Sequence, residues 1–319
     1  MSATTLPTPF TEVDLAMPDR REGKVRVSFA LPSARRLIVT TDRLSAFDRV
    51  IAGVPYKGQV LNQLSAWWFD RTHDVVDNHL LSVPDPNASI VRSATPLPVE
   101  VVVRGYITGV TDTSLWRRYD EGERVIYGHR LPDGLLKNTP LPDPIVTPTT
   151  KAGHGGHDVP ITCDEVVSRD LVEPEMWERV MAVALELFDR GTAIGVDAGL
   201  VLADTKYEFG VADDDASLLL IDEVHTPDSS RWWVAETYPD RLAAGDEPES
   251  LDKEIVRRAF AALGYRGDGP VPALDPEVWS ATALRYVDAF ERLTGSSFAP
   301  GPTPVASRLD HNLRKAGVL

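Results

Sequence analysis

Short apolar segments separated by turn residues predict several strands along this chain. Valines dominate residues 99–103, which is typical of a buried strand, and Pro96 and Pro98 interrupt the apolar segment just before them. An acidic turn at residues 212–216 joins two other apolar segments and predicts an antiparallel hairpin. The expected strands lie in residues 24–31, 35–42, 89–109, 200–211 and 217–226.

Other segments repeat apolar residues at helical spacing. The clearest is residues 174–194, where Pro174 suits a first helical turn and an apolar stripe follows. Asp275 and Gly295 are suited to cap the two ends of another helix. The expected helices lie in residues 58–72, 174–194, 251–264 and 275–295. By contrast, residues 128–160 are rich in Pro and Gly and predict a long loop, and the last 20 or so residues are expected to lie over the surface.

Composition narrows the class of protein. The chain has 319 residues, 43% of them hydrophobic and 25% charged, which is ordinary for a globular protein of two lobes or one large domain. Its net charge of −15 disfavours binding to nucleic acid or to an anionic membrane. No apolar segment is long enough to cross a membrane, and residues 1–15 do not resemble a secretory signal. Cys163 is the one cysteine, which fits a reducing, cytoplasmic location.

Charged residues alternate in the segment 201–210, "VLADTKYEFG". Asp204, Lys206 and Glu208 are spaced two apart, so a strand places all three on one face. The hairpin turn sets Asp222 opposite Lys206 or Glu208, on that same face. Carboxylates that converge from two strands suit Mg²⁺, which prefers oxygen ligands and often binds together with nucleotide phosphates. The alternative is a solvated sheet face with charges of both signs.

Basic residues elsewhere suggest anion binding. Arg104 ends the run of valines, where a charge is costly unless it meets an anion, with an internal salt bridge as the alternative. Ser230 and Arg231 directly follow the second hairpin strand, and Arg is well shaped to hold phosphate or carboxylate. Lys24 and Arg26 lie at a strand start in "GKVR", where they are placed to hold phosphates.

Taken together, these segments resemble the SAICAR synthetase family of de novo purine synthesis. The resemblance covers residues 23–260 and continues into the helix beyond. It rests on nine stretches in register: "GKVR", "TTDRLSAFDR", "KGQVLNQLSAWWF", "VEVVVRGYITG", "TDTSLW", "TPTTKA", "DTKYEFG", "IDEVHTPDSSRWW" and "DKEIVRRAF". It implies an α+β fold of two lobes: a small β-rich N-terminal lobe at residues 1–97, and a larger α/β lobe at residues 98–319 with an antiparallel sheet and flanking helices. The ATP site is expected between them.

The activity that the resemblance implies is an ATP-dependent, amide-forming ligation. The carboxylate of 5-amino-4-carboxyimidazole ribonucleotide is joined to L-aspartate through an acyl phosphate, which releases ADP and phosphate. Such phosphoryl transfer depends on positioning and charge neutralisation more than on a protein nucleophile. The partners are therefore small molecules, with neither nucleic acid nor membrane, and the chain is expected to be a monomer or homodimer.

The resemblance also assigns roles to individual residues. Lys206 and Asp204 are the expected catalytic residues, Lys24 and Arg26 bind ATP, and Glu208 and Asp222 bind Mg²⁺. The residues expected to bind the other substrates are Arg104, Lys151, Asp158, Ser230, Arg231, Lys253 and Arg257.

Two positions depart from the family pattern. Larger members of the family usually read "GKVRD" and "RGYITGS", whereas this chain has Val27 and Val110 at the last positions of these motifs. An alternative is therefore a paralogue that ligates a related azole carboxylate to an amino acid. A non-catalytic nucleotide sensor is a second alternative, but it predicts that the metal-binding carboxylates and Lys206 are lost, and all are present. A kinase-like enzyme lacks support, because no "HRD" or "DFG" motif occurs.

Overall fold

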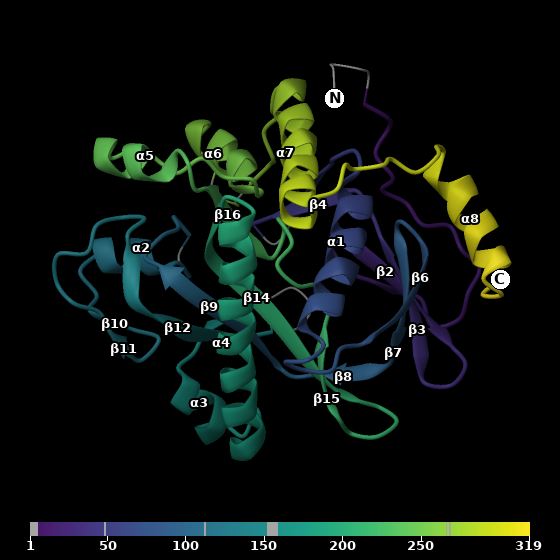
Figure 1. Cartoon of the computed structure of the whole chain (residues 1–319), viewed down its shortest axis with the longest axis horizontal. Helices are drawn as coiled ribbons and strands as arrows, with labels where there is room; N and C mark the ends of the chain where they lie inside the picture. Colours follow the sequence, from purple (N-terminus) through teal and green to yellow (C-terminus); the bar gives the residue numbers. More distant parts are fainter. Residues whose placement is uncertain (1–5, 48, 112, 152–158, 266, 268) are drawn as a thin grey trace.

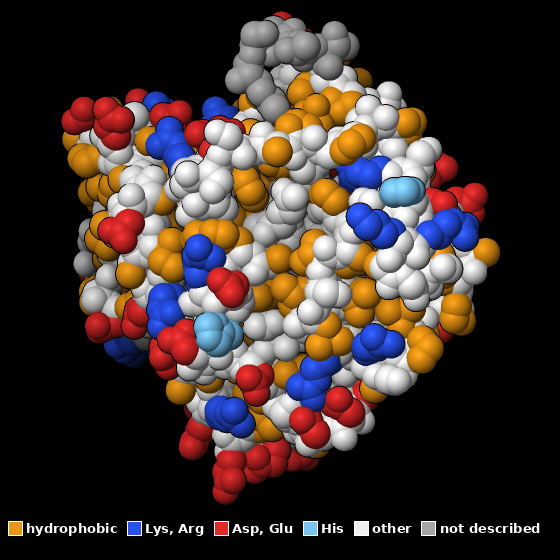
Figure 2. All heavy atoms as spheres, turned by 45° about the vertical axis from the view of Figure 1, so that its right-hand side comes forward, with side chains coloured by type: hydrophobic (Ala, Val, Ile, Leu, Met, Phe, Trp, Pro, Cys, Tyr) orange, Lys and Arg blue, Asp and Glu red, His pale blue; other side chains and the backbone are white. Residues whose placement is uncertain are grey.

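The computed structural model describes residues 6–319 except 48, 112, 152–158, 266 and 268. It is a mixed α+β structure built on antiparallel sheets, with eight helices among the described residues (Figure 1). In the view of Figure 2, acidic side chains gather at the lower end of the molecule, and others lie among basic side chains on the face above. None of the described helices combines the length and apolar character that a membrane span requires.

The first sheet has five strands and two different faces. Val27, Phe29, Leu37 and Val39 point to one face and form a buried cluster with the C-terminal helix. Because side chains alternate along a strand, Arg26 and Thr40 point to the opposite face. The strand order is β1 (Arg21–Glu22), β2 (Arg26–Leu31), β3 (Arg35–Thr40), β7 (Ala88–Arg92) and β6 (Leu80–Asp85).

The second sheet is larger and is centred on the long strand β14. Its strand order is β13 (Val159–Pro160), β12 (Pro140–Thr150), β9 (Val99–Tyr106), β14 (Leu200–Ala212) and β15 (Leu218–Ile221), with β8 (Ala94–Pro96) and β16 (Ser230–Val234) also paired to β14. Two small hairpins complete the strands, β4 (Arg43–Ala46) with β5 (Arg49–Gly53) and β10 (Val125–Ile126) with β11 (His129–Arg130). The main core packs against this sheet, with valines of β9 and aromatic residues of β14 fully buried.

Helices cover the second sheet and connect it to the first. In Figure 1, α4 runs across the second sheet, α1 lies between the two sheets and α8 lies beside β6. The helices are α1 (Lys57–Thr72), α2 (Leu115–Asp120), α3 (Cys163–Ser168), α4 (Pro174–Asp197), α5 (Tyr238–Ala244), α6 (Glu254–Ala262), α7 (Pro276–Thr294) and α8 (Val305–Lys315). Local sequence sets their ends: Glu173 caps the amide of Met176, and Gly295 ends α7 with a left-handed φ of 66°.

Most of the predicted elements are confirmed, and two expectations are wrong. The four predicted helices and the hairpin of β14 and β15 are present. The predicted loop 128–160 instead contains the eleven-residue strand β12, which pairs with β9 despite its four prolines. The last residues do not merely lie over the surface, because they form α8, which buries Leu309 and Leu313. The division of the chain at residue 97 stays a prediction.

Candidate active site

The middle of β14 carries a carboxylate between two arginines. Asp204 lies opposite Arg104 on β9 and opposite Arg231 on β16. One oxygen of Asp204, Oδ2, accepts hydrogen bonds from both guanidinium groups, with the Nη1 of Arg104 at 3.4 Å. All three side chains are largely buried. The internal salt bridge that was the alternative for Arg104 is therefore present, and Arg231 belongs to the same group, whereas the predicted role of Arg104 in substrate binding stays a prediction.

Lys206 follows Asp204 by two residues on β14, and its ammonium lies among carboxylates. Its ammonium contacts Glu208 and lies 3.2 Å from Glu100 and 3.8 Å from Asp222. Lys151 binds the other oxygen of Glu208 at 2.5 Å. Burial raises the pKa of Glu208, but Lys206 and Lys151 outweigh that effect and hold it below its ordinary value. Glu208 is therefore ionised where it lies between Lys206 and Lys151.

Asp222 joins the cluster by a route that the sequence did not predict. Ile221, not Asp222, lies opposite Glu208, so the predicted register is wrong. Asp222 has a left-handed φ of 68°, which turns the chain out of β15 and brings the carboxylate back toward Lys206. Burial raises the pKa of Asp222 to about 6, although Arg26 beside it favours the charged form.

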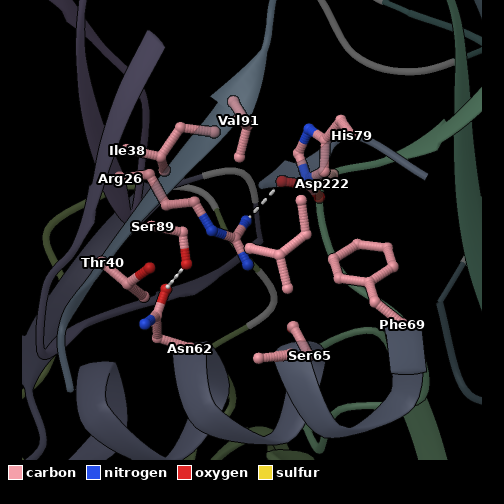
Figure 3. A pocket seen from close by; sticks show the side chains of 12 residues that line it. Arg26, Ile38, Thr40, Asn62, Ser65, Phe69, His79, Ser89, Val91 and Asp222 are labelled. Carbon is pink, nitrogen blue, oxygen red and sulfur yellow. Dashed lines mark hydrogen bonds and ion pairs between the residues drawn. The ribbon is translucent and has the colours of Figure 1, made fainter. Parts of the chain in front are cut away.

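Arg26 connects the first sheet to this cluster. Its guanidinium binds Asp222 at 2.5 Å and Glu223 at 3.0 Å. Figure 3 shows Arg26 reaching over α1 toward Asp222 and His79. Arg26, Asp222 and His79 line a pocket of about 310 Å³, partly open to solvent, whose other side chains come from β3, β6, β7 and α1. The predicted partner of Arg26, Lys24, is exposed on the segment before β2 and does not line this pocket.

The turn 226–229 and the start of β16 hold several hydroxyl groups in place. Ser230 is buried, and its Oγ lies 2.8 Å from the Oγ1 of Thr205 on β14. Thr226 donates to Glu223 at 2.6 Å, which ties this turn to the carboxylate that binds Arg26. The hydroxyl of Ser230 is thus already paired with a neighbouring strand.

The start of α6 reaches the same group of arginines. Glu254 lies 3.8 Å from Arg231 and 3.1 Å from Arg257. The preceding residue, Lys253, lies 3.8 Å from Asp228, and burial lowers the pKa of Lys253. Burial also raises the pKa of Asp252 to about 6, and the carboxylate of Glu254 adds to this rise. Lys253 and Arg257 therefore lie beside these charged groups, and their binding of substrate stays a prediction.

Several contributors to the site were absent from the predicted residues, among them the carboxylates of Glu100, Glu223 and Glu254 described above. Lys57, at the start of α1, is fully buried and binds Asp228 at 2.9 Å. The hydroxyl of Tyr286 on α7 donates to the other oxygen of Asp228 at 2.7 Å. A lysine at a helix start and a tyrosine in an apolar stripe give no sequence signal for such pairing. Asp158, which was predicted to bind substrate, lies outside the described residues.

A second pocket, of about 240 Å³ and partly open to solvent, lies beside Arg231. Its lining includes Lys137 and Arg258 as cations and Glu247 and Glu254 as carboxylates. Val110 also lines it and is 42% exposed, although the rest of the lining is mainly polar.

The donor set near Lys206 fits a magnesium ion that is held by few protein ligands. Glu208 and Asp222 both approach the ammonium of Lys206, so their oxygens face a common point. No group of three or more His, Cys, Asp or Glu residues suited to a metal occurs in the part of the chain that the structure describes. Mg²⁺ is often bound by one or two carboxylates together with substrate phosphates, so two ligands are sufficient.

Known proteins are similar to this chain over most of its length. The family model described as SAICAR synthetase matches residues 19–272. A protein of Agrobacterium fabrum named putative phosphoribosylaminoimidazole-succinocarboxamide synthase 2 is 46% identical, over 93% of this chain and 94% of its own. A Legionella pneumophila protein named phosphoribosylaminoimidazole-succinocarboxamide synthase is 45% identical, over 97% and 99% of the two chains.

Solved structures show the same fold. A SAICAR synthase from Saccharomyces cerevisiae, complexed with SAICAR, has a TM-score of 0.77 and 30% identity and covers 91% of this chain and all of its own. A type-2 SAICAR synthetase in complex with ADP has a TM-score of 0.68 and 25% identity, over 88% of this chain and all of its own. The chain therefore belongs to the SAICAR synthetase family and is an ATP-dependent ligase of purine biosynthesis, a phosphoribosylaminoimidazole-succinocarboxamide synthase.

Proposed function

We propose that this enzyme ligates 5-amino-4-carboxyimidazole ribonucleotide to L-aspartate through an acyl phosphate. An oxygen of the imidazole carboxylate attacks the γ-phosphorus of ATP, the bond from that phosphorus to the bridging oxygen breaks, and ADP leaves. The amine of L-aspartate then attacks the activated carbon. The bond from that carbon to the phosphate oxygen breaks, phosphate leaves and the amine loses a proton. The observation that carries the proposal is the row of buried or partly buried charges on one face of β14, from Asp204 to Glu208.

The cations on this face and beside it suit the charges that develop in such a reaction. Lys206 is assigned to the transferred phosphoryl group, because nearby carboxylates keep its ammonium charged and in place. Burial lowers the pKa of Lys206, but the surrounding carboxylates together outweigh this effect and raise the pKa well above its ordinary value. Arg26 and Lys24 are assigned to the phosphates of ATP. The ADP complex of the type-2 relative supports a nucleotide site in this fold.

The two arginines beside Asp204 are assigned to the anionic groups of the ribonucleotide. Asp204 fixes both guanidinium groups before substrate arrives, which reduces the cost of ordering them on binding. Lys151, Asp158, Ser230, Lys253 and Arg257 are assigned to the ribonucleotide or to L-aspartate. Glu208 and Asp222 would hold Mg²⁺, which when bound neutralises phosphate charge. A cytoplasmic location and a monomer or homodimer stay predictions from the sequence.

A phosphate-release assay tests the proposal. We expect release only when ATP, the imidazole ribonucleotide and L-aspartate are all present. Binding of ATP with no turnover under any substrate combination would support the nucleotide sensor instead.

One observation favours the paralogue as a second candidate. Val27 is fully buried in the core on the face opposite Arg26, so this departure from the family pattern does not reach the nucleotide side. Val110, in contrast, lines the pocket beside Arg231 and is half exposed. Phosphate release with a different azole carboxylate, and none with the imidazole compound, would identify the paralogue.

A further inference from the structure

The C-terminal helix is fastened to the first sheet by a buried carboxylate. Asp85, the last residue of β6, has a side chain with no solvent exposure. Arg308 of α8 donates to both of its oxygens, at 3.0 and 3.2 Å. Asn312, one turn further along α8, donates to Oδ2 at 2.7 Å. Two side chains of one helix therefore hold the end of a strand more than 200 residues away in sequence.

This contact is more specific than the packing of α8 requires. Leu309 and Leu313 already bury the apolar side of the helix against β2 and β3. A charged pair that is removed from water costs desolvation energy, and an apolar pair of the same size often serves stability equally well. Buried ionic groups can instead fix one particular register between two elements.

Asn87 connects the buried carboxylate to the strand end beside Arg26. The backbone amide of Asn87 donates to the carboxylate of Asp85 at 2.8 Å, and the side-chain oxygen of Asn87 accepts from Arg308. Its side-chain nitrogen donates to the carbonyl of Thr40 at 2.9 Å, and its carbonyl accepts from the amide of Thr40 at 2.8 Å. Thr40 is the register partner of Arg26, and both line the pocket between the first sheet and α1.

We propose that Asp85 and Arg308 are positioning residues for nucleotide binding. Through Asn87 they fix the end of β3, and with it the neighbouring start of β2, from which Arg26 reaches Asp222. This inference rests on the proposed assignment of Arg26 to the phosphates of ATP. α8 thus holds the first sheet in place from the face opposite Arg26, which is the face away from the proposed nucleotide site (Figure 1).

The test compares Arg308→Met and Arg308→Lys with Arg314→Met in the full chain. Arg314 lies on the same helix, but it is exposed and pairs only locally with Asp310, so it controls for loss of a charge on α8. Isothermal titration calorimetry measures the Kd of ADP and, separately, the Kd of the imidazole ribonucleotide. We expect Arg308→Met to raise the Kd of ADP about tenfold, with the ribonucleotide Kd and both constants of Arg314→Met within twofold of the parent enzyme.

Arg308→Lys keeps the charge but loses the two-point contact, so we expect a smaller rise for ADP alone. If circular dichroism shows that Arg308→Met does not fold, Arg308→Lys alone tests the proposal. Unchanged ADP binding in a folded Arg308 variant, or equal weakening for both ligands, would overturn the proposal. Arg26→Gln separates this failure from failure of the proposed function. If Arg26→Gln binds ADP normally, the assignment of Arg26 to the phosphates of ATP is wrong. If Arg26→Gln binds ADP weakly while Arg308→Lys and Arg308→Met bind it normally, only the positioning role of Asp85 and Arg308 is contradicted.

Discussion

Asp204 and Arg231 lie directly opposite each other on β14 and β16, and their ion pair joins the two strands at the centre of the site. Arg104 reaches the same carboxylate oxygen from β9, on the other side. Asp204 is thus placed to orient two substrate-binding arginines at once.

Asp204→Asn should therefore weaken binding of the ribonucleotide. The neutral amide keeps the shape of the side chain but removes the charge that holds both guanidinium groups. Hydrogen bonds to charged groups contribute about 1.5–3 kcal/mol, so we expect the KM of the ribonucleotide to rise by about 10- to 100-fold. Steady-state kinetics with each substrate varied in turn measures this. Asp213→Asn, in the exposed hairpin turn, is the matched control and should behave as the parent enzyme. An unchanged KM in Asp204→Asn would remove Asp204 from this role.

Lys206→Ala should abolish most turnover and leave the fold intact. Removal of one positioned charge that stabilises a transition state costs about 10²–10³-fold in rate. Lys151 and Arg26 still compensate the carboxylates that Lys206 leaves behind, so the chain should fold. Phosphate release gives the rate, and circular dichroism checks the fold. Lys315→Ala, at the exposed end of α8, controls for a lysine lost elsewhere. Near-normal rates would show that the role assigned to Lys206 is wrong.

Asp222→Asn should raise the concentration of Mg²⁺ needed for half-maximal rate. Asp222 also binds Arg26, so a change in ATP binding alone is not diagnostic. Glu223→Gln provides the comparison, because Glu223 binds Arg26 at 3.0 Å but is not a predicted metal ligand. Titration of Mg²⁺ at saturating ATP should separate the two variants. The same magnesium dependence in both would place Asp222 outside the metal site.

The sequence predicted the charged face of β14 because period-two spacing depends only on the strand. It did not predict how Asp222 arrives there, since a left-handed residue at the end of β15 breaks the alternation on which the register argument rests. Lys57 was missed for a related reason. Its burial follows from the packing of α1 near Asp228, a residue 171 positions away in the sequence. The pattern of residues around Lys57 does not indicate that contact.

The two wrong expectations about the fold have different causes. Leu309 and Leu313 are four residues apart, so a helical signal was present in α8 but was obscured by the nearby prolines and glycines. In β12 the four prolines favour a loop when the sequence is read alone. A strand tolerates proline where its missing amide would not have bonded to a neighbour, and β12 meets β13 only at Thr149 and Thr150.

His225 should make the free energy of unfolding depend on pH. It is fully buried, and burial lowers its pKa from 6.5 to about 3, although a bond to the carbonyl of Leu187 acts in the opposite direction. Between pH 6.5 and 3 the unfolded chain therefore binds a proton that the folded chain does not, so stability falls as pH falls. From pH 7 to pH 5 this histidine accounts for about 2 kcal/mol.

Urea unfolding of the parent chain and of His225→Gln at both pH values measures this contribution. The variant should lose about 2 kcal/mol less between pH 7 and pH 5 than the parent. His79, whose pKa burial also lowers to about 3, remains in the variant and keeps part of the pH dependence. Identical pH dependence in the two proteins would mean that His225 is protonated in the fold.

Tyr286→Phe should destabilise the protein through Asp228. Burial raises the pKa of Asp228, but Lys253, Lys57 and the hydroxyl of Tyr286 together hold it below its ordinary value. Removing a hydrogen bond to a buried charge costs about 1.5–3 kcal/mol, whereas Tyr238→Phe, which loses a bond to the neutral carbonyl of Asn138, should cost about 0.5–1.5 kcal/mol. Urea unfolding at pH 7 measures both. Lys57→Met removes the closer of two lysines and should cost about 3–5 kcal/mol, because the nearest cation left to Asp228 among the described residues is Lys253, at 3.8 Å. If Tyr286→Phe costs no more than Tyr238→Phe, Asp228 is not ionised in the folded protein.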